Sequence, residues 1–429
     1  MTSQSHSSIA GGLWEEFVTS AWEKRAVVLS GIMPETLVSE ADLFRTFLEA
    51  SKRYRASLEN GLVFWVDGKT IADCAEHLPQ ASDESLRGYT TRVERELGDY
   101  TVLLANPHLY DDSLWERVRL FVRGLHAHTG VSNGGADTTF FLGRYRRTPF
   151  GVHRGQMSVL TFPVCGPKRF RVWPRGYGEA HPEIEGLVDY PDHAQASAEL
   201  SGAPGDVMYW PADIWHIGEG GDEFAATLSI GFWWDRAPLT RVLLELSRQL
   251  AESIEQPDPR GITFPPETVL RNGAAPAKLP GSVVEALRAV RAIADGKDLD
   301  LALSTEWLQA MSADSFREVP PLRPASPDVS SVQTLRRSPA SRILFASAGN
   351  TRLTVAANGH IHIAAANQVV RSLLRDLNLK GIAHLTAAIW RSRPAQELIQ
   401  WLYQAGAVEE KDVNQPQAAP ALSKAARHR

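Results

Sequence analysis

Two histidines in glycine-rich and apolar surroundings are the residues best suited to chemistry. His153 lies in the segment Phe150–Leu160, and His216 ends the segment Pro204–His216. A neutral imidazole ring is a common metal ligand. A single histidine inside a β-rich domain is nevertheless more often a hydrogen-bonded core residue. The residue types alone leave both roles open, so the elements that position the two side chains must be considered.

The region that contains both histidines, residues 137–235, is predicted to be rich in short strands. Glycine and proline separate β-prone runs throughout it, which is typical of a sandwich or a barrel. The expected strands are Thr139–Leu142, Ser158–Val164, Phe170–Trp173, Val207–Trp210 and Thr227–Trp234.

The alternation of side chains in extended backbone relates His153 to its neighbours. Positions 153 and 155 face the same side, whereas Arg154 and Gln156 face the other. Gln156 could turn inward only if a bulge at Gly155 shifted the register.

The segments around His153 and His216 resemble those of the JmjC family of iron- and 2-oxoglutarate-dependent oxygenases, in particular its bacterial ribosomal-oxygenase-like branch. That family has a His-x-Asp pair and a distant second histidine, which follows a Gly-Asp-x-x-Tyr-x-Pro segment. Residues 205–211 match this segment closely. The resemblance implies that His153 and His216 bind Fe(II), and that Lys168 binds the distal carboxylate of the cosubstrate 2-oxoglutarate.

The chain departs from the family pattern at Gly155, which stands where the metal-binding Asp or Glu is expected. Three alternatives follow. Another side chain, such as Gln156, Asp137 or Asp213, could complete the metal site and support hydroxylation. A halide such as chloride could occupy the open position, as in iron- and 2-oxoglutarate-dependent halogenases. Iron chemistry could also be lost, leaving a protein that binds a peptide or nucleic acid without catalysis.

The resemblance extends in outline to most of the chain and implies an α+β fold. Its centre is a double-stranded β-helix, the jelly roll of cupin and JmjC proteins. The expected units are an N-terminal helical and strand cap (1–130), the barrel (131–236), a helical segment of the kind that mediates dimerisation (237–318), a linker (319–340), a winged-helix-like domain (341–410) and a disordered tail (411–429).

Hydrophobic periodicity and turn signals predict the elements outside the barrel. A strand is expected at 62–66, before the turn Asp67-Gly68, and a hairpin around Asn358-Gly359. Helices are expected at residues 9–24, 39–51, 112–128, 238–254, 282–294, 303–311, 367–378, 381–391 and 394–405.

Composition limits the remaining function classes. The 429 residues carry a formal net charge of −5, which gives no reason to expect attraction of the whole chain to nucleic acid. Two cysteines, Cys74 and Cys165, cannot build a disulfide framework. No signal peptide and no 18-residue apolar run is evident, so we expect a cytoplasmic protein with a peptide or protein substrate and no membrane span.

Overall fold

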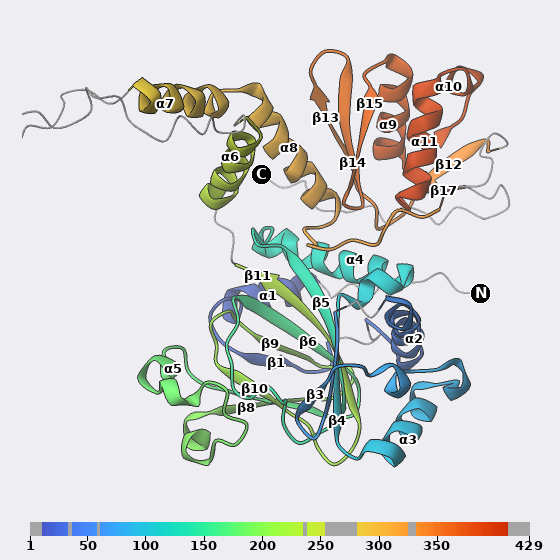
Figure 1. The fold of residues 1–429 in the computed structure, drawn as a ribbon. Coiled ribbons are helices and arrows are strands. Elements are labelled where there is room, and N and C mark those ends of the chain that lie inside the picture. The colour runs from blue at the N-terminus through green and yellow to red at the C-terminus, as the bar shows by residue number, and fades with distance from the viewer. Residues whose placement is uncertain are drawn as a thin grey trace, which may run out of the picture.

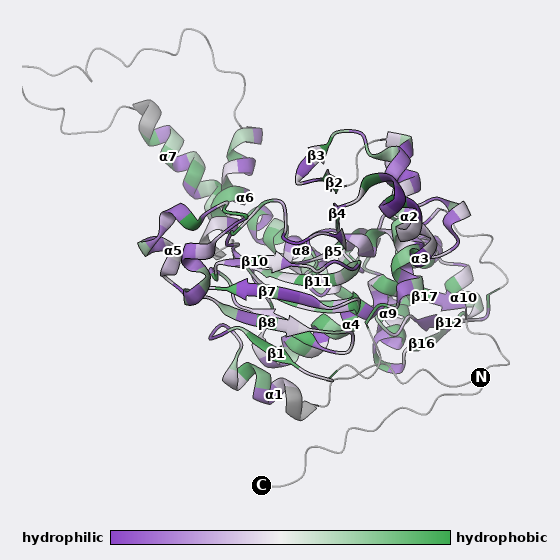
Figure 2. Ribbon diagram, turned by 90° about the horizontal axis from the view of Figure 1, so that it is seen from below, coloured by the Kyte–Doolittle hydropathy of each residue, from purple (hydrophilic) through white to green (hydrophobic). Residues whose placement is uncertain are grey.

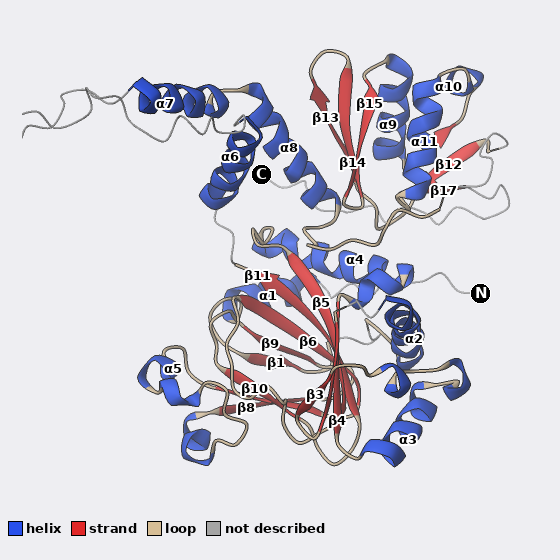
Figure 3. Ribbon diagram, in the orientation of Figure 1, coloured by secondary structure: helices blue, strands red, loops and turns tan. Residues whose placement is uncertain are grey.

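The computed structural model describes residues 11–32, 37–57, 61–234, 238–253, 281–324 and 332–410. Figures 1 and 3 show a strand-rich body with helices along one side of it, and a smaller body that carries the C-terminal strands and helices. A group of helices, α6–α8, follows the strand-rich body in the chain. The tail predicted to be disordered, 411–429, lies outside the described residues.

The N-terminal cap combines helices with strands that extend the barrel. Helix α2 begins with a reciprocal cap, in which Ser39 and Asp42 each bind the backbone N–H of the other. Helix α4 begins at Asp111, whose carboxylate accepts from the N–H of Leu114. The elements are α1 (Gly11–Ser20), β1 (Val27–Leu29), α2 (Glu40–Ser57), β2 (Leu62–Val66), β3 (Lys69–Ile71), α3 (Leu86–Leu97), β4 (Tyr100–Ala105) and α4 (Asp112–Thr129).

The barrel consists of two antiparallel sheets. The larger has the order β1-β9-β6-β11-β5-β4-β2-β3, and the smaller has the order β10-β7-β8. The smaller sheet lies at the front in Figure 2, where β7 is largely hydrophilic. The barrel strands are β5 (Ala136–Arg144), β6 (Met157–Cys165), β7 (Lys168–Val172), β8 (Ala198–Gly202), β9 (Val207–Trp210), β10 (His216–Glu219) and β11 (Ala225–Trp233).

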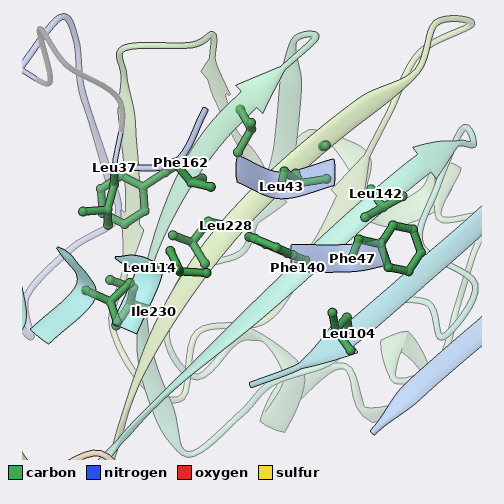
Figure 4. Close-up of a cluster of buried hydrophobic side chains, with 14 of the residues drawn as sticks. Leu37, Leu43, Phe47, Leu104, Leu114, Phe140, Leu142, Phe162, Leu228 and Ile230 are labelled. Carbon is green, nitrogen blue, oxygen red and sulfur yellow. The ribbon is translucent and has the colours of Figure 1, made fainter. Parts of the chain in front are cut away.

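Side chains alternate between the two faces of the larger sheet. One face of β5 and β11 packs against α2 and α4 to form the main core. Figure 4 shows Phe140, Leu142, Leu228 and Ile230 in this layer. The opposite face lines a cavity and carries Asp137, Thr139 and Phe141 from β5 and Thr227, Ser229 and Gly231 from β11.

The C-terminal body contains two three-stranded sheets with the orders β13-β14-β15 and β16-β12-β17. The helices that precede it are α6 (Pro238–Ser253), α7 (Gly281–Ala294) and α8 (Lys297–Ser312). Its own elements are β12 (Thr334–Arg337), β13 (Ile343–Ala348), β14 (Arg352–Ala357), β15 (His360–Ala365), α9 (Gln368–Lys380), β16 (Ile382–His384), α10 (Ala387–Trp390), α11 (Arg393–Gln404) and β17 (Val408–Glu410).

Two sequence predictions in this body were wrong. Residues 334–337, assigned to the linker, form β12 and pair with both β16 and β17. The helix expected at 381–391 is instead strand β16 followed by the short helix α10. Gly381, with φ +70°, ends α9 in the left-handed conformation and allows the chain to turn into β16. These short strands are specified by their distant partners, which local patterns do not reveal.

Candidate metal and anion site

His153 and His216 are joined through their backbones. The N–H of His153 donates to the carbonyl of His216 at 3.0 Å, and the N–H of His216 donates to the carbonyl of His153 at 2.8 Å. This antiparallel bridge brings the imidazole ring centroids within 4.2 Å of each other. The structure thus unites two residues that are far apart in the sequence.

The same kind of hydrogen bond orients both imidazole rings. His153 Nδ1 donates to the carbonyl of Gly151 at 3.0 Å, and His216 Nδ1 donates to the carbonyl of Ile214 at 2.9 Å. Because Nδ1 holds the proton, Nε2 of each ring keeps a free lone pair. Metal-binding histidines commonly have such a carbonyl partner on the second nitrogen.

Burial keeps both rings neutral. It lowers the pKa of His153, and it lowers the pKa of His216 to about 3, with a further lowering from the neighbouring His153. A neutral imidazole is the form that binds metals. The pair is therefore ready to bind a cation at neutral pH without first losing protons.

The two rings border a cavity of about 160 Å³ inside the barrel. Its walls are mainly apolar and aromatic. Phe150 lies 4.8 Å from the His153 ring, and Trp210 lies 4.9 Å from the His216 ring, measured between centroids. Apolar walls lower the local dielectric constant, which strengthens electrostatic interactions near them.

Lys168 lines the same cavity, although it is only 1% exposed. Its Nζ donates to the Tyr145 hydroxyl at 2.5 Å and lies 4.7–5.2 Å from the ring centroids of Phe141, Tyr145 and Phe170. Burial lowers the pKa of Lys168 to about 7, and Glu219 partly opposes the shift. A buried ammonium group without a bound carboxylate is costly, so this environment favours the entry of an anion.

Gly218 provides the space beside the lysine. A Cβ added at this position would lie 2.9 Å from Lys168 Nζ and 2.8 Å from a methyl carbon of Thr148. Gly218 pairs with Phe170 across the smaller sheet. Strands β7 and β10 thus position the lysine ammonium group beside Gly218, two residues after His216, which begins β10.

The position of the missing carboxylate is open. A Cβ added at Gly155 would meet the Met157 side chain at 3.7 Å, an ordinary contact, and Met157 lines the cavity. The side chains of Gln156 and Asp213 are exposed and do not line the cavity. Of the alternative ligands considered from the sequence, Asp137 alone lines it.

Asp137 is held by a hydrogen bond from Trp233 Nε1, and burial raises its pKa to about 6. Among the described residues, no set of three His, Cys, Asp or Glu donors lying within 4.8 Å of one another includes His153 or His216. Within that part of the chain, a third protein ligand is therefore not in place beside the two histidines.

Sequence reasoning missed the partners of Lys168. Tyr145 lies between two arginines in the sequence, yet its ring is buried. Its proximity to Lys168 arises from the pairing of distant strands. No short motif in the sequence signals the contact.

Residues 131–238 match the family model described as JmjC domain. This part of the chain is therefore similar to JmjC domains. The match agrees with the resemblance stated for the barrel, and it includes both histidines and Lys168. No curated protein matched the chain in sequence.

Solved structures of the ribosomal oxygenase YcfD from Escherichia coli have the same overall fold as this chain. One is 19% identical, with a TM-score of 0.51, and the match covers 93% of this chain and 98% of that chain. YcfD in complex with cobalt and 2-oxoglutarate gives 18% identity, the same TM-score and the same coverage. A further YcfD structure gives a TM-score of 0.52. At such identities the likeness concerns the fold alone.

No helix among the described residues is long and apolar enough to cross a membrane.

Proposed function

We propose that the protein is an Fe(II)- and 2-oxoglutarate-dependent oxygenase that hydroxylates a C–H bond of a peptide or protein side chain. The observation that carries the proposal is the shared cavity of three groups. Two neutral imidazoles present free Nε2 atoms, and Lys168 lies buried with its ammonium group bonded to a tyrosine hydroxyl rather than to a carboxylate of the described residues. A metal and a dianion are the ligands that these groups fit together.

The residues present suit this pair of ligands. His153 and His216 would hold Fe(II) through Nε2, since imidazole suits iron. Lys168 would bind the distal carboxylate of 2-oxoglutarate as a charge-assisted hydrogen bond, with Tyr145 orienting the ammonium group. The bound iron and cosubstrate supply the oxidising power. The chain positions the groups and shields them from water.

The open position at Gly155 supports a second candidate reaction. Because no third His, Cys, Asp or Glu among the described residues joins the two histidines, a halide could bind there, and a halogenase would result. A non-catalytic protein that binds a peptide or nucleic acid in the barrel or the C-terminal body is the third candidate. The buried lysine favours the two enzymatic candidates, because simple peptide binding does not require it.

The partners remain proposals as well. A peptide or protein substrate is supported by the likeness to YcfD, which is a ribosomal oxygenase. Homodimerisation through residues 237–318 is supported by exposed apolar side chains on α6 and α8, namely Leu243, Leu244, Leu301 and Trp307. The winged-helix-like character of 341–410 and the cytoplasmic location are likewise proposed.

Conversion of 2-oxoglutarate to succinate tests the enzymatic proposal. Purified protein loaded with Fe(II) should form succinate, and His153→Ala and Lys168→Met should each abolish it. Arg169→Ala is the matched control, because Arg169 follows Lys168 in β7 but is exposed. Turnover that persists in His153→Ala would contradict the proposal. So would failure of the loaded wild-type protein to turn over with any peptide pool.

Product mass separates the two reactions. Hydroxylation adds oxygen whether or not chloride is present, whereas halogenation requires the halide and adds its mass. The same peptide pool would be incubated in chloride-free and chloride-containing buffer. A chlorinated product would overturn the hydroxylation proposal and support the halogenase.

A further inference from the structure

The connection between β7 and β8 carries a second cluster of metal-binding side chains. His181 ends the short helix α5, Glu183 lies in the turn Pro182–Ile184, and His193 lies in the turn Pro191–Ala196. One donor atom from each residue lies within 4.8 Å of the other two. In the described part of the chain, this is the one such group found.

The carboxylate lies between the two imidazoles. Glu183 Oε1 is 3.3 Å from His181 Nδ1 and 3.9 Å from His193 Nε2. The longer distance exceeds that of a hydrogen bond, so a direct Glu183–His193 bond does not account for the arrangement. Two imidazole nitrogens and one carboxylate oxygen form a ligand set that proteins use for zinc.

Tyr177 orients both histidines of the cluster. Its hydroxyl lies 3.0 Å from His193 Nδ1, which leaves Nε2 directed toward Glu183. The Tyr177 ring also stacks on His181, with centroids 4.5 Å apart. A hydrogen bond to the second nitrogen of a histidine is the usual support of a metal ligand.

The burial of the cluster suits a site that can be loaded from solvent. The side chain of His193 is 11% exposed, whereas those of His181 and Glu183 are 45% and 59% exposed. The His193 side of the cluster is buried, and its backbone is held by Trp173, whose Nε1 donates to the His193 carbonyl at 2.9 Å. The side formed by His181 and Glu183 is open to solvent, so a water molecule could be the fourth ligand of a four-coordinate cation.

We propose that His181, Glu183 and His193 bind a divalent transition cation of the Zn²⁺ type, at a site separate from that of His153 and His216. The proposal is independent of the enzymatic function, because the two sites share no ligand. The second cation would join the three short helical turns of the β7–β8 connection.

The connection packs against residues next to the first site. A Cβ added at Gly178 would lie 2.1 Å from the Trp215 ring, so the backbone there is in close contact with the residue before His216. Arg154, which follows His153, forms an ion pair with Glu179 and lies over the Trp215 ring. A cation at the second site would therefore stiffen a segment that supports both histidines of the first.

Zinc titration of the full chain tests the proposal. Calorimetry with Zn²⁺ should show that Glu183→Gln, and separately His181→Ala, each remove one equivalent of bound zinc. Both residues are exposed or half-exposed, so the variants should fold. Their affinity at this site should fall by more than about a hundredfold, because even outer-shell partners cost about 10- to 100-fold. Glu185→Gln, a nearby exposed glutamate, is the matched control and should bind as wild type.

A variant that lacks both histidines of the first site distinguishes zinc bound at the second site from zinc bound at the first. The double variant His153→Ala/His216→Ala should keep one equivalent of zinc, and adding Glu183→Gln to it should remove that equivalent. Cobalt absorption gives an independent readout, since a low-symmetry Co²⁺ band should persist in the double variant and vanish in the triple one. Unchanged zinc stoichiometry in both Glu183→Gln and His181→Ala would overturn the proposal.

Discussion

At the scale of single residues, the buried ammonium group of Lys168 sets how the cavity responds to pH. Burial lowers its pKa to about 7. A bound carboxylate would stabilise the charged form and raise the pKa, so binding of 2-oxoglutarate should take up a proton above pH 7. The affinity should therefore decrease as the pH rises through this window.

The first prediction concerns this decrease in affinity for 2-oxoglutarate with rising pH. Between pH 7.5 and 8.5, the affinity of the metal-loaded protein for 2-oxoglutarate should fall by about tenfold, since each pH unit above the pKa removes about a factor of ten of the protonated lysine. Lys168→Arg should flatten the dependence, because arginine stays charged. Calorimetric titration at several pH values measures both. An equally steep decline in Lys168→Arg would assign the dependence to another group.

The second prediction concerns Gly155. Gly155→Asp should increase retention of Fe(II) and raise substrate-free succinate formation, because a carboxylate would be added two residues after His153, beside the cavity-lining Met157. Its thermal unfolding temperature should stay within about 2 °C of wild type, since the added Cβ meets ordinary contacts. Metal analysis after dialysis and succinate assays measure these effects. No change in either would cast doubt on iron at this site.

At the scale of elements, the smaller sheet positions the lysine. Strand β7 carries Lys168, and Gly218 of β10 leaves the space for its ammonium group. The third prediction is that Gly218→Ala raises the KM for 2-oxoglutarate at least about tenfold, because the methyl group would displace the lysine or overpack the cavity at a cost of about 1–3 kcal/mol. Gly221→Ala is the matched control, with almost no neighbouring atom near its Cβ. Equal KM values for both variants would refute the positioning role.

Many of the helices and strands could be predicted from the sequence. Strands β5, β6, β9 and β11 and helix α4 match the expected runs, because apolar periodicity and turn residues are local signals. Strands β4, β8, β10 and β12 were not predicted. His153, His216 and Lys168 were proposed as site residues through motif resemblance. Their shared cavity, and the contact of Lys168 with Tyr145, depend on tertiary pairing that no local pattern contains.

At the scale of the whole molecule, α4 connects the barrel to the C-terminal body. Arg119 Nη1 donates to Asn358 Oδ1 at 2.6 Å, and Arg123 forms an ion pair with Asp314 at 2.7 Å. Asn358 in turn donates to the carbonyl of Ala405 at 2.8 Å. Arg119 is 1% exposed, so removal of Asn358 would leave a buried charge without this partner.

The fourth prediction uses the buried His108, which also links distant parts of the chain. Its Nε2 donates to the carbonyl of Glu318 at 3.0 Å, and Nδ1 accepts from Thr138. Burial lowers its pKa to about 4 from the usual 6.5. Between these values the unfolded chain binds more protons than the folded one, so stability is lost as the pH falls through this window.

From His108 alone, the free energy of unfolding should fall by roughly 2 kcal/mol between pH 8 and pH 5. His126, whose pKa burial also lowers to about 4, should add to the effect. Urea unfolding at each pH measures the loss. His108→Gln should remove its share of the pH dependence, whereas His128→Gln, at an exposed position of α4, should not. An unchanged slope in His108→Gln would show that His108 is not responsible.

The backbone bridge between His153 and His216 makes the spacing of the two imidazole rings independent of the residue at position 155. The spacing of the two rings is fixed by main-chain hydrogen bonds, which do not depend on the side chain at position 155. Under the proposed function, a change of that residue would therefore alter the reactivity of the site without rebuilding the barrel. A carboxylate and a glycine could be exchanged there by a single substitution in either direction. The barrel would stay folded in the same way, while the substitution at position 155 changes which reaction the site carries out.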